Sequence, residues 1–310
     1  MGREVTLAGR VLKGDRRAVA AAITLVENGG EAGDLLREIG TATGRAFILG
    51  LTGPPGTGKS TLVDRLIAGF REAGLKVGVI AVDPTSPLTG GALLGDRVRM
   101  VRHTLDGGVF IRSMATRGWS GGLSGAVSEA VQILDAAGMD VVMVETAGVG
   151  QSDVEVMKVA HAVVVVTMPG LGDDVQASKA GLMEIGDVYV VNKSDLPGAD
   201  AMAVDLLSMA RDSKVRSPTV LSVSALSGDG MDRLFSAVEG LRKRFVSPEG
   251  AEMRLRSIRG MVMELAKRRL LGEFEERASG PAMALARRVA DRSMTFEQAA
   301  EQLVRSQRGR

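Results

Sequence analysis

The residues best suited to chemistry lie in GPPGTGKST, at positions 53–61. They match the pattern G-x-x-x-x-G-K-[ST], in which glycines let backbone N–H groups wrap phosphates. Lys59 places a cation on the outer phosphates, and the Ser60 hydroxyl can ligate Mg²⁺. An apolar run precedes the motif and a helical pattern follows it, as a phosphate site at a helix N-terminus requires. The predicted phosphate-binding residues are Gly53, Pro54, Pro55, Gly56, Thr57, Gly58, Lys59, Ser60 and Thr61.

A second polar motif, NKSD, follows the apolar run VYVV and ends at Asp195. A carboxylate there can accept hydrogen bonds from the ring N–H and the exocyclic amine of guanine, a donor pair that adenine lacks. The tripeptide SAL follows the next apolar run, and its small residues let backbone N–H groups reach the guanine carbonyl. In this order after a phosphate loop, the two motifs predict a guanine site formed by Asn192, Lys193, Asp195, Ser224, Ala225 and Leu226.

Acidic and amide residues in ETAGVGQSD, at 145–153, are candidates for the hydrolytic step. Glu145 stands at a predicted strand end, the usual place for a carboxylate near magnesium, and Gly148 or Gly150 is the candidate γ-phosphate sensor. Gln151 is either the residue that orients the attacking water or a surface amide. The predicted catalytic residues are Lys59, Glu145 and Gln151.

Two aspartates can complete an oxygen shell for Mg²⁺. Asp83 ends the strand after the phosphate loop, whereas Asp96 lies in a glycine-rich segment and is equally explained as a helix cap. The predicted metal-site residues are Ser60, Asp83, Asp96 and Glu145. The polar stretch 169–181 is either a solvated loop or a further nucleotide-responsive switch, with Asp173, Gln176 and Lys179 as its candidate residues.

Seven short apolar runs alternate with helical patterns, which predicts an α/β fold with a doubly wound, mainly parallel sheet. The predicted strands are 46–52, 77–82, 109–114, 140–146, 161–168, 187–192 and 219–224. Helical patterns before and after them predict N- and C-terminal helical extensions. Pro281 suits a first helical position, and Thr295 with Gln298 reads as a capping box. The expected domains are 1–45, 46–243 and 244–310.

Composition narrows the function classes. The 310 residues include no cysteine and two histidines, which excludes disulfide frameworks, cysteine nucleophiles and histidine-rich metal sites. No apolar run approaches the roughly 18 residues of a membrane span, and no signal-peptide pattern opens the chain, so a cytoplasmic protein is expected. The basic C-terminal tail allows a nucleic-acid partner, but few aromatic residues accompany it. A helix face or a protein interface is preferred.

The ordered set GPPGTGKST, DPTSPLTGGALLGD, ETAGVGQSD, PGLGDDVQASK, NKSD and SAL resembles the MeaB-type GTPases. These are G-protein chaperones of adenosylcobalamin-dependent methylmalonyl-CoA mutase, formerly called ArgK or LAO/AO transport-system kinases. The resemblance covers roughly residues 8–245. It implies a homodimer of the signal-recognition/MinD-like class whose C-terminal helices form the dimer arm. GTP hydrolysis with Mg²⁺ would gate cobalamin loading of the mutase and removal of damaged cofactor.

The resemblance also assigns roles to matching positions. By this resemblance, Asp83, Asp96 and Glu145 are the acids that the family uses for conformational change and for its metal site. Gln151 stands at the position of the family's glutamine. The segment with Asp173, Gln176 and Lys179 matches an extra switch that communicates with the mutase; this chain has ASKAG where the family often has GIKKG.

The sequence leaves four alternative functions to compare with this one. A true kinase, as the old family name suggests, needs an acceptor site and a base that no motif identifies. A nickel-insertion GTPase needs Cys and His ligands that the chain lacks. An interaction protein with lost nucleotide chemistry is disfavoured by the intact motifs, and a nucleic-acid GTPase rests on tail charge alone. Methylmalonyl-CoA mutase is the leading client, with isobutyryl-type and ethylmalonyl-type mutases also open.

Overall fold

The computed structural model of the protein describes residues 6–28, 30, 32–83, 101–103, 105–115, 122–148, 157, 159–170, 185–212 and 219–307. The chain divides into two compact units, residues 1–261 and residues 262–310.

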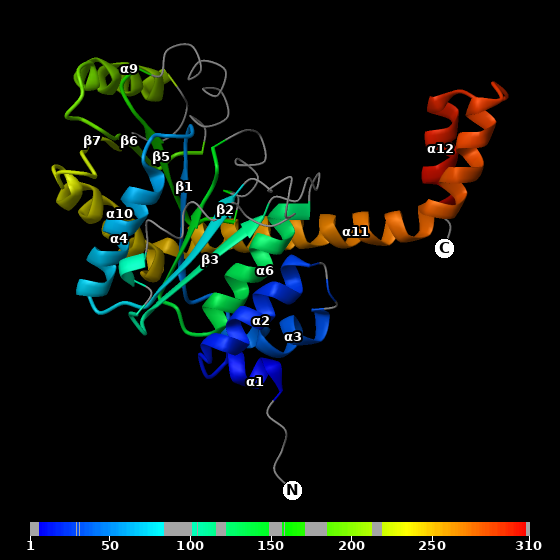
Figure 1. The fold of residues 1–310 in the computed structure, drawn as a ribbon, viewed down its shortest axis with the longest axis horizontal. Coiled ribbons are helices and arrows are strands. Elements are labelled where there is room, and N and C mark those ends of the chain that lie inside the picture. The colour runs from blue at the N-terminus through cyan, green and yellow to red at the C-terminus, as the bar shows by residue number, and fades with distance from the viewer. Residues whose placement is uncertain are drawn as a thin grey trace, which may run out of the picture. The chain divides into compact units, whose positions relative to one another are not determined.

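The described part of the first unit contains a seven-stranded sheet in the order β3-β2-β4-β1-β5-β6-β7, with every neighbouring pair parallel (Figure 1). Each predicted strand is present within one or two residues of its expected bounds. The strands are β1 (Phe47–Thr52), β2 (Val77–Asp83), β3 (Val109–Ala115), β4 (Val141–Glu145), β5 (Ala162–Thr167), β6 (Val188–Val191) and β7 (Thr219–Ser222).

The strand order places β1 between β4 and β5, where the chain crosses from one half of the sheet to the other. In doubly wound folds, ligands bind outside the carboxyl ends of the strands at such a switch point. The residues after β1 therefore stand where a ligand is expected, and these residues are the predicted phosphate loop.

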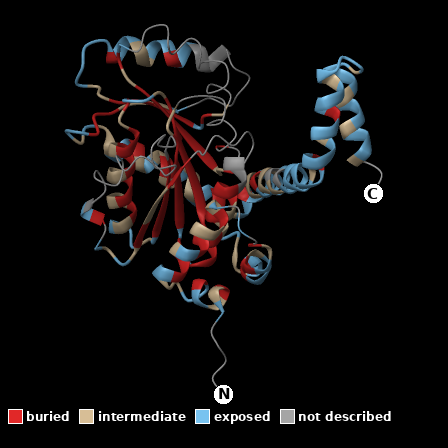
Figure 2. Ribbon diagram, turned by 45° about the vertical axis from the view of Figure 1, so that its right-hand side comes forward, coloured by how far each residue is buried: buried red, intermediate tan, exposed pale blue. Residues whose placement is uncertain are grey.

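Helices cover both faces of the sheet, and the strands β1, β4, β5 and β6 are buried along their whole length (Figure 2). One hydrophobic cluster combines one set of strand residues with α1 (Leu7–Val11), α2 (Arg16–Glu27), α3 (Gly33–Ile39), α6 (Gly122–Ala136) and α9 (Ala199–Asp212). The alternate strand residues pack with α4 (Lys59–Glu72) and α10 (Met231–Val246). This arrangement explains why the strands read as nearly continuous apolar runs.

The predicted N-terminal helical extension is part of this packing. Asp15 caps α2 by accepting hydrogen bonds from the N–H groups of Arg17 and Ala18, at 2.9 and 3.1 Å. Buried residues such as Ile23 and Val26 join the core cluster. The extension therefore covers one face of the sheet instead of standing apart from it.

The C-terminal sequence is helical, in α11 (Ala251–Ala290) and α12 (Phe296–Gln307), and α11 runs through the division between the two units. Pro281 lies inside α11, so the prediction that it opens a helix is wrong. A proline inside a helix loses one backbone hydrogen bond, but the following residues, AMALARR, favour helix and continue it.

The predicted capping box is confirmed. The N–H of Gln298 donates to Thr295 Oγ1 at 3.2 Å, and the N–H of Thr295 donates to Gln298 Oε1 at 3.0 Å. A search of the described helices found none with the length and apolar character to cross a bilayer.

Candidate nucleotide site

The phosphate loop joins the carboxyl end of β1 to the N-terminus of α4 (Figure 1). Gly58 is the N-cap of α4 and has a φ of 91°, in the left-handed region. A Cβ at this position would lie 2.4 Å from Nδ2 of Asn192, so a side chain would collide with the guanine motif. Because the N-cap residue is a glycine, it has no side chain to cap this helix N-terminus, whose dipole favours an anion.

Lys59 is buried, with 6% of its surface exposed, and its ammonium lies inside the loop. Nζ donates to the carbonyl oxygens of Gly53 and Pro54, at 2.8 and 3.0 Å. Phosphate oxygens are stronger acceptors for an ammonium than neutral carbonyls. The loop therefore holds the cation where phosphates of a bound nucleotide would take over its hydrogen bonds.

Gly148 is the candidate γ-phosphate sensor that the structure places against the loop. Its φ is 83°, and a Cβ there would lie 1.8 Å from the carbonyl oxygen of Gly53 and 3.0 Å from Nζ of Lys59. Only glycine allows this approach. The other candidate sensor, Gly150, lies outside the described residues.

Ser60 and Glu145 form a buried polar pair at the same edge of the sheet. Oγ of Ser60 donates to Oε1 of Glu145 at 2.7 Å, and each residue is at most 5% exposed. Register aligns Glu145 with Leu51 of β1 and Ala81 of β2. Asp83 is the last residue of β2, two positions beyond Ala81, as predicted.

This donor set fits Mg²⁺, which prefers oxygen ligands and takes one or two carboxylates together with phosphates and water. No cluster of three or more His, Cys, Asp or Glu residues suited to a metal occurs within the described ranges. A magnesium that binds nucleotide phosphates does not require such a cluster. Asp96 lies outside the described residues.

Asp195, the predicted guanine-reading carboxylate, is exposed at the end of the loop after β6. The Ser224 hydroxyl donates to its Oδ1 at 2.6 Å. This hydrogen bond is the main cause of a lowered pKa of Asp195. The side chain is therefore a carboxylate near neutral pH, as acceptance from guanine requires.

Asn192 connects the guanine motif to the phosphate loop. It is 2% exposed; its Nδ2 donates to the carbonyl oxygen of Thr57 at 2.7 Å, and its Oδ1 accepts from the N–H of Ala225 at 3.0 Å. Lys193 follows with a left-handed φ of 57°. The structure thus brings the three predicted motifs together, although it gives the N–H of Ala225 to Asn192, where the sequence analysis assigned it to guanine.

Arg65 is a site residue that the sequence analysis missed. It lies on α4, and its Nε and Nη2 donate to the carbonyl oxygens of Ala225 and Leu226, at 3.1 and 3.0 Å. Its partners are backbone atoms about 160 positions away, so no side-chain pattern marks the contact. Its only sequence signal is its place one turn beyond the phosphate motif.

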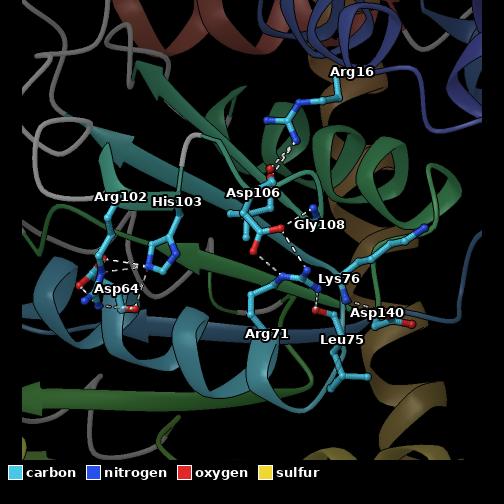
Figure 3. Close-up of polar contacts among 11 residues, drawn as sticks. Arg16, Asp64, Arg71, Leu75, Lys76, Arg102, His103, Asp106, Gly108 and Asp140 are labelled. Atoms are coloured by element: carbon cyan, nitrogen blue, oxygen red, sulfur yellow. Dashed lines mark hydrogen bonds and ion pairs between the residues drawn. The ribbon is translucent and has the colours of Figure 1, made fainter.

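Two further charged residues of α4 hold loops at the edge of β3 (Figure 3). Asp64 accepts from Nε of Arg102 at 2.7 Å and lies 3.0 Å from Nε2 of His103, in the short 3-10 helix Val101–His103. Farther along the helix, Arg71 pairs with Asp106 at 2.8 Å. Residues 101–103 directly follow the segment that contains Asp96. Through these contacts, Asp64 ties residues 101–103 to α4, the helix that begins at the phosphate loop.

The remaining predicted residues lie outside the described part of the chain. They are Asp96, Gln151, Asp173, Gln176 and Lys179. Their roles stay predictions of the sequence.

Comparison with known proteins gives one family and several relatives. The family model described as methylmalonyl Co-A mutase-associated GTPase MeaB matches residues 19–278. The chain is 54% identical over 248 residues to a putative GTPase of Pyrococcus horikoshii, covering 78% of each chain. It is 39% identical over 253 residues to GTPase ArgK of Escherichia coli, covering 77% of this chain and 76% of the relative.

Among solved structures, the crystal structure of an LAO/AO transport system kinase is similar. The TM-score is 0.68 at 28% identity, and the match covers 99% of each chain. The similarity therefore extends over the whole length of the chain.

Proposed function

Because the chain belongs to the family of methylmalonyl-CoA mutase-associated GTPases, MeaB, we propose that it is a G-protein chaperone of an adenosylcobalamin-dependent acyl-CoA mutase. The chain is a P-loop GTPase, as its family and its relatives are named. In the proposed role, GTP binding and hydrolysis gate cofactor loading of the mutase and protect it from damaged cofactor. Methylmalonyl-CoA mutase is the leading client.

The observation that carries the nucleotide assignment is the double hydrogen bond of Asn192. One side chain holds the phosphate loop and the base loop at a fixed separation, which suits a ligand with a phosphate chain at one end and a purine at the other. Asp195 is then the group that distinguishes guanine from adenine. This reasoning supports GTP and GDP as the ligands.

We infer that hydrolysis proceeds by positioning and charge stabilisation, without a covalent intermediate. Lys59 supplies positive charge to the outer phosphates, and the N-terminus of α4 orients N–H groups toward them. Ser60, with Asp83 and Glu145, would hold Mg²⁺, which neutralises charge on the phosphate oxygens when bound. The hydrogen bond from Ser60 to Glu145 orients the hydroxyl for that task. Gln151 is the proposed water-orienting residue.

The proposed site for communication with the mutase is the segment of Asp173, Gln176 and Lys179. Slow basal hydrolysis is expected, since no arginine of the sequence is assigned to the transition state. Binding of the mutase is expected to raise the rate, because a partner can supply or order the missing groups.

The proposed homodimer is supported by apolar side chains of the second unit. In the described residues of that unit, Val262, Leu270, Met283 and Phe296 are each more than half exposed. Exposed apolar side chains at this density favour a protein interface. Sedimentation at several concentrations tests the dimer, and a monomer mass at every concentration would contradict it.

The kinase alternative is not favoured. The family and the relatives of higher identity are named GTPases, and the chain carries no assigned acceptor site. Release of labelled phosphate from GTP to water, with none on an added protein or small molecule, is the expected result.

The test of the proposed function is GTP hydrolysis by the purified protein with and without a purified adenosylcobalamin-dependent mutase from the same source. ATP is the parallel control. Slow GTP-selective hydrolysis that accelerates with the mutase is expected. Hydrolysis that does not respond to the mutase, together with no complex in a pull-down, would contradict the chaperone role and leave the GTPase assignment intact.

A further inference from the structure

Within the described residues, two side chains from different parts of the chain bind the backbone of the base loop, residues 224–226. The N–H of Ala225 is bound by Asn192, and the carbonyl oxygens of Ala225 and Leu226 are bound by Arg65. Ser224 and Ala225 are buried, whereas Leu226 is exposed. The loop therefore enters the core and leaves it again within three residues, and Arg65 holds the point where it leaves.

Arg65 ties this loop to the element that binds phosphate. It lies on α4, six positions after Lys59, and it is part of the rigid helix that begins at the phosphate loop. Asn192 makes a second connection to that element through Thr57. Two separate side chains thus set the separation between the base loop and the phosphate loop.

The guanidinium group suits this contact. Its planar fork donates through two nitrogens in a fixed geometry, and here it spans two successive carbonyl groups. Lysine carries the same charge but no such fork. Neutral replacements of similar length offer fewer donors.

We propose that Arg65 is a positioning residue for base selectivity: it fixes residues 224–226 relative to the phosphate loop so that the guanine ring is held in one place. This inference rests on the assignment of the guanine site. A base loop without this support would still accept a purine, but the loop and Asp195 would no longer meet the guanine edge together. Selectivity between guanine and adenine should then fall more than catalysis does.

A purely structural role for Arg65 makes a different prediction. In that case its loss would lower the melting temperature without changing the choice of nucleotide. Arg71 provides the matched control, because it lies on the same helix and its guanidinium also bridges two partners, Asp106 and the carbonyl oxygen of Leu75 (Figure 3). Arg71 contacts the turn before β3, not the base loop.

The experiment compares Arg65→Gln, Arg65→Lys and Arg71→Lys in the full chain. The readouts are kcat and KM for GTP, competition by GDP and ADP against a fluorescent guanine nucleotide, and melting temperature. For Arg65→Gln we expect about a tenfold rise in KM and an equal loss of GDP-over-ADP preference, with a fall of kcat of less than about threefold. Arg65→Lys should lie between this variant and the wild type. Arg71→Lys should keep the wild-type preference.

Unchanged GDP-over-ADP preference in both Arg65 variants, or a loss of kcat without a rise in KM, would overturn the proposal. If Arg65→Gln does not fold, the milder Arg65→Lys carries the same test. A wild-type protein that does not prefer GDP to ADP would instead refute the guanine assignment itself. The two failures are therefore distinguishable.

Discussion

The two edges of the sheet use polar side chains in opposite ways. At the carboxyl edge, Lys59 and Ser60 make hydrogen bonds that a bound nucleotide and its metal can take over. At the amino edge, aspartate carboxylates accept hydrogen bonds from the backbone N–H groups at the strand entrances. Asp135 accepts from the N–H groups of residues 44–46, Asp140 from Lys76 and Asp187 from Val163.

The difference indicates that polar side chains at the carboxyl edge serve chemistry, whereas those at the amino edge stabilise the fold. A buried N–H without an acceptor costs free energy, so the amino-edge contacts stabilise the fold. Burial raises the pKa of Asp135 and Asp187, and their hydrogen bonds to backbone N–H groups offset this rise only in part. Changes at the carboxyl edge should therefore affect hydrolysis, and changes at the amino edge should affect unfolding.

The largest effect is expected for Lys59→Ala. It removes the buried cation from the phosphate site, and loss of a preorganised electrostatic contact of this kind lowers rates by about 100-fold or more. Phosphate release measures the rate, and circular dichroism checks the fold. Lys76→Ala is the control, because the Lys76 side chain is exposed and only its backbone N–H takes part in the amino edge. Equal activity in the two variants would contradict the assignment of Lys59.

A pair of glycines with nearly equal backbone angles tests the comparison more sharply. Gly148, at the carboxyl edge, has a φ of 83° and no room for a Cβ, whereas Gly138, before β4 at the amino edge, has a φ of 84° and open space around it. Gly148→Ala should lower hydrolysis at least tenfold, because the new methyl collides with the phosphate loop.

Gly138→Ala should lower the free energy of unfolding by about 1 kcal/mol, because alanine is disfavoured in the left-handed region. The kinetics of hydrolysis should not change. Urea unfolding and steady-state hydrolysis measure the two effects. A Gly148→Ala enzyme with wild-type kcat and KM would show that Gly148 does not approach the phosphates.

A separate effect at the amino edge concerns pH. Nδ1 of His161 accepts from the N–H of Ile48 at 2.9 Å, and its ring stacks on Phe245. Burial, with a smaller contribution from Arg254, lowers the pKa of His161 to about 3. The unfolded chain has a histidine pKa of about 6.5 and binds a proton first as pH falls. The contribution of neutral His161 to the free energy of unfolding is therefore complete above about pH 6.5 and is lost as pH falls toward 3.

At pH 5 the expected loss from His161 is about 2 kcal/mol, at 1.36 kcal/mol for each pH unit below 6.5. Urea unfolding at pH 7 and pH 5 measures it. His161→Gln keeps an acceptor for the N–H of Ile48 but cannot titrate. The difference in pH dependence between the two proteins therefore measures the contribution of the imidazole separately from those of Asp135 and Asp187. The same pH dependence in both would show that His161 is not responsible.

The carboxyl edge could be predicted from the sequence far better than the amino edge. The phosphate and guanine motifs are short and ordered, and the strand before each motif is an apolar run whose end marks the edge. All seven strands followed from the same runs. Asp135, Asp187 and His161 gave no signal, since each binds a backbone N–H whose position depends on the folded chain. Arg65 was missed because its partners, the carbonyl oxygens of Ala225 and Leu226, are also backbone atoms whose positions depend on the folded chain.

The prediction for Pro281 failed because local preference was outweighed. Proline favours a first helical turn, but the residues that follow it favour helix, and α11 continues through Pro281. The capping box at Thr295 and Gln298 succeeded because both of its hydrogen bonds are local.

The central claim, that the carboxyl edge binds a guanine nucleotide, is tested most directly by the base preference of Asp195→Asn. Xanthine presents a carbonyl where guanine presents its exocyclic amine, so an asparagine amide pairs with it and the carboxylate does not. We expect the variant to lose about 100-fold in affinity for GDP and to gain affinity for xanthosine diphosphate, measured by competition against the same fluorescent nucleotide. A variant that keeps the GDP preference of the wild type would contradict the account, because Asp195 would then not read the base.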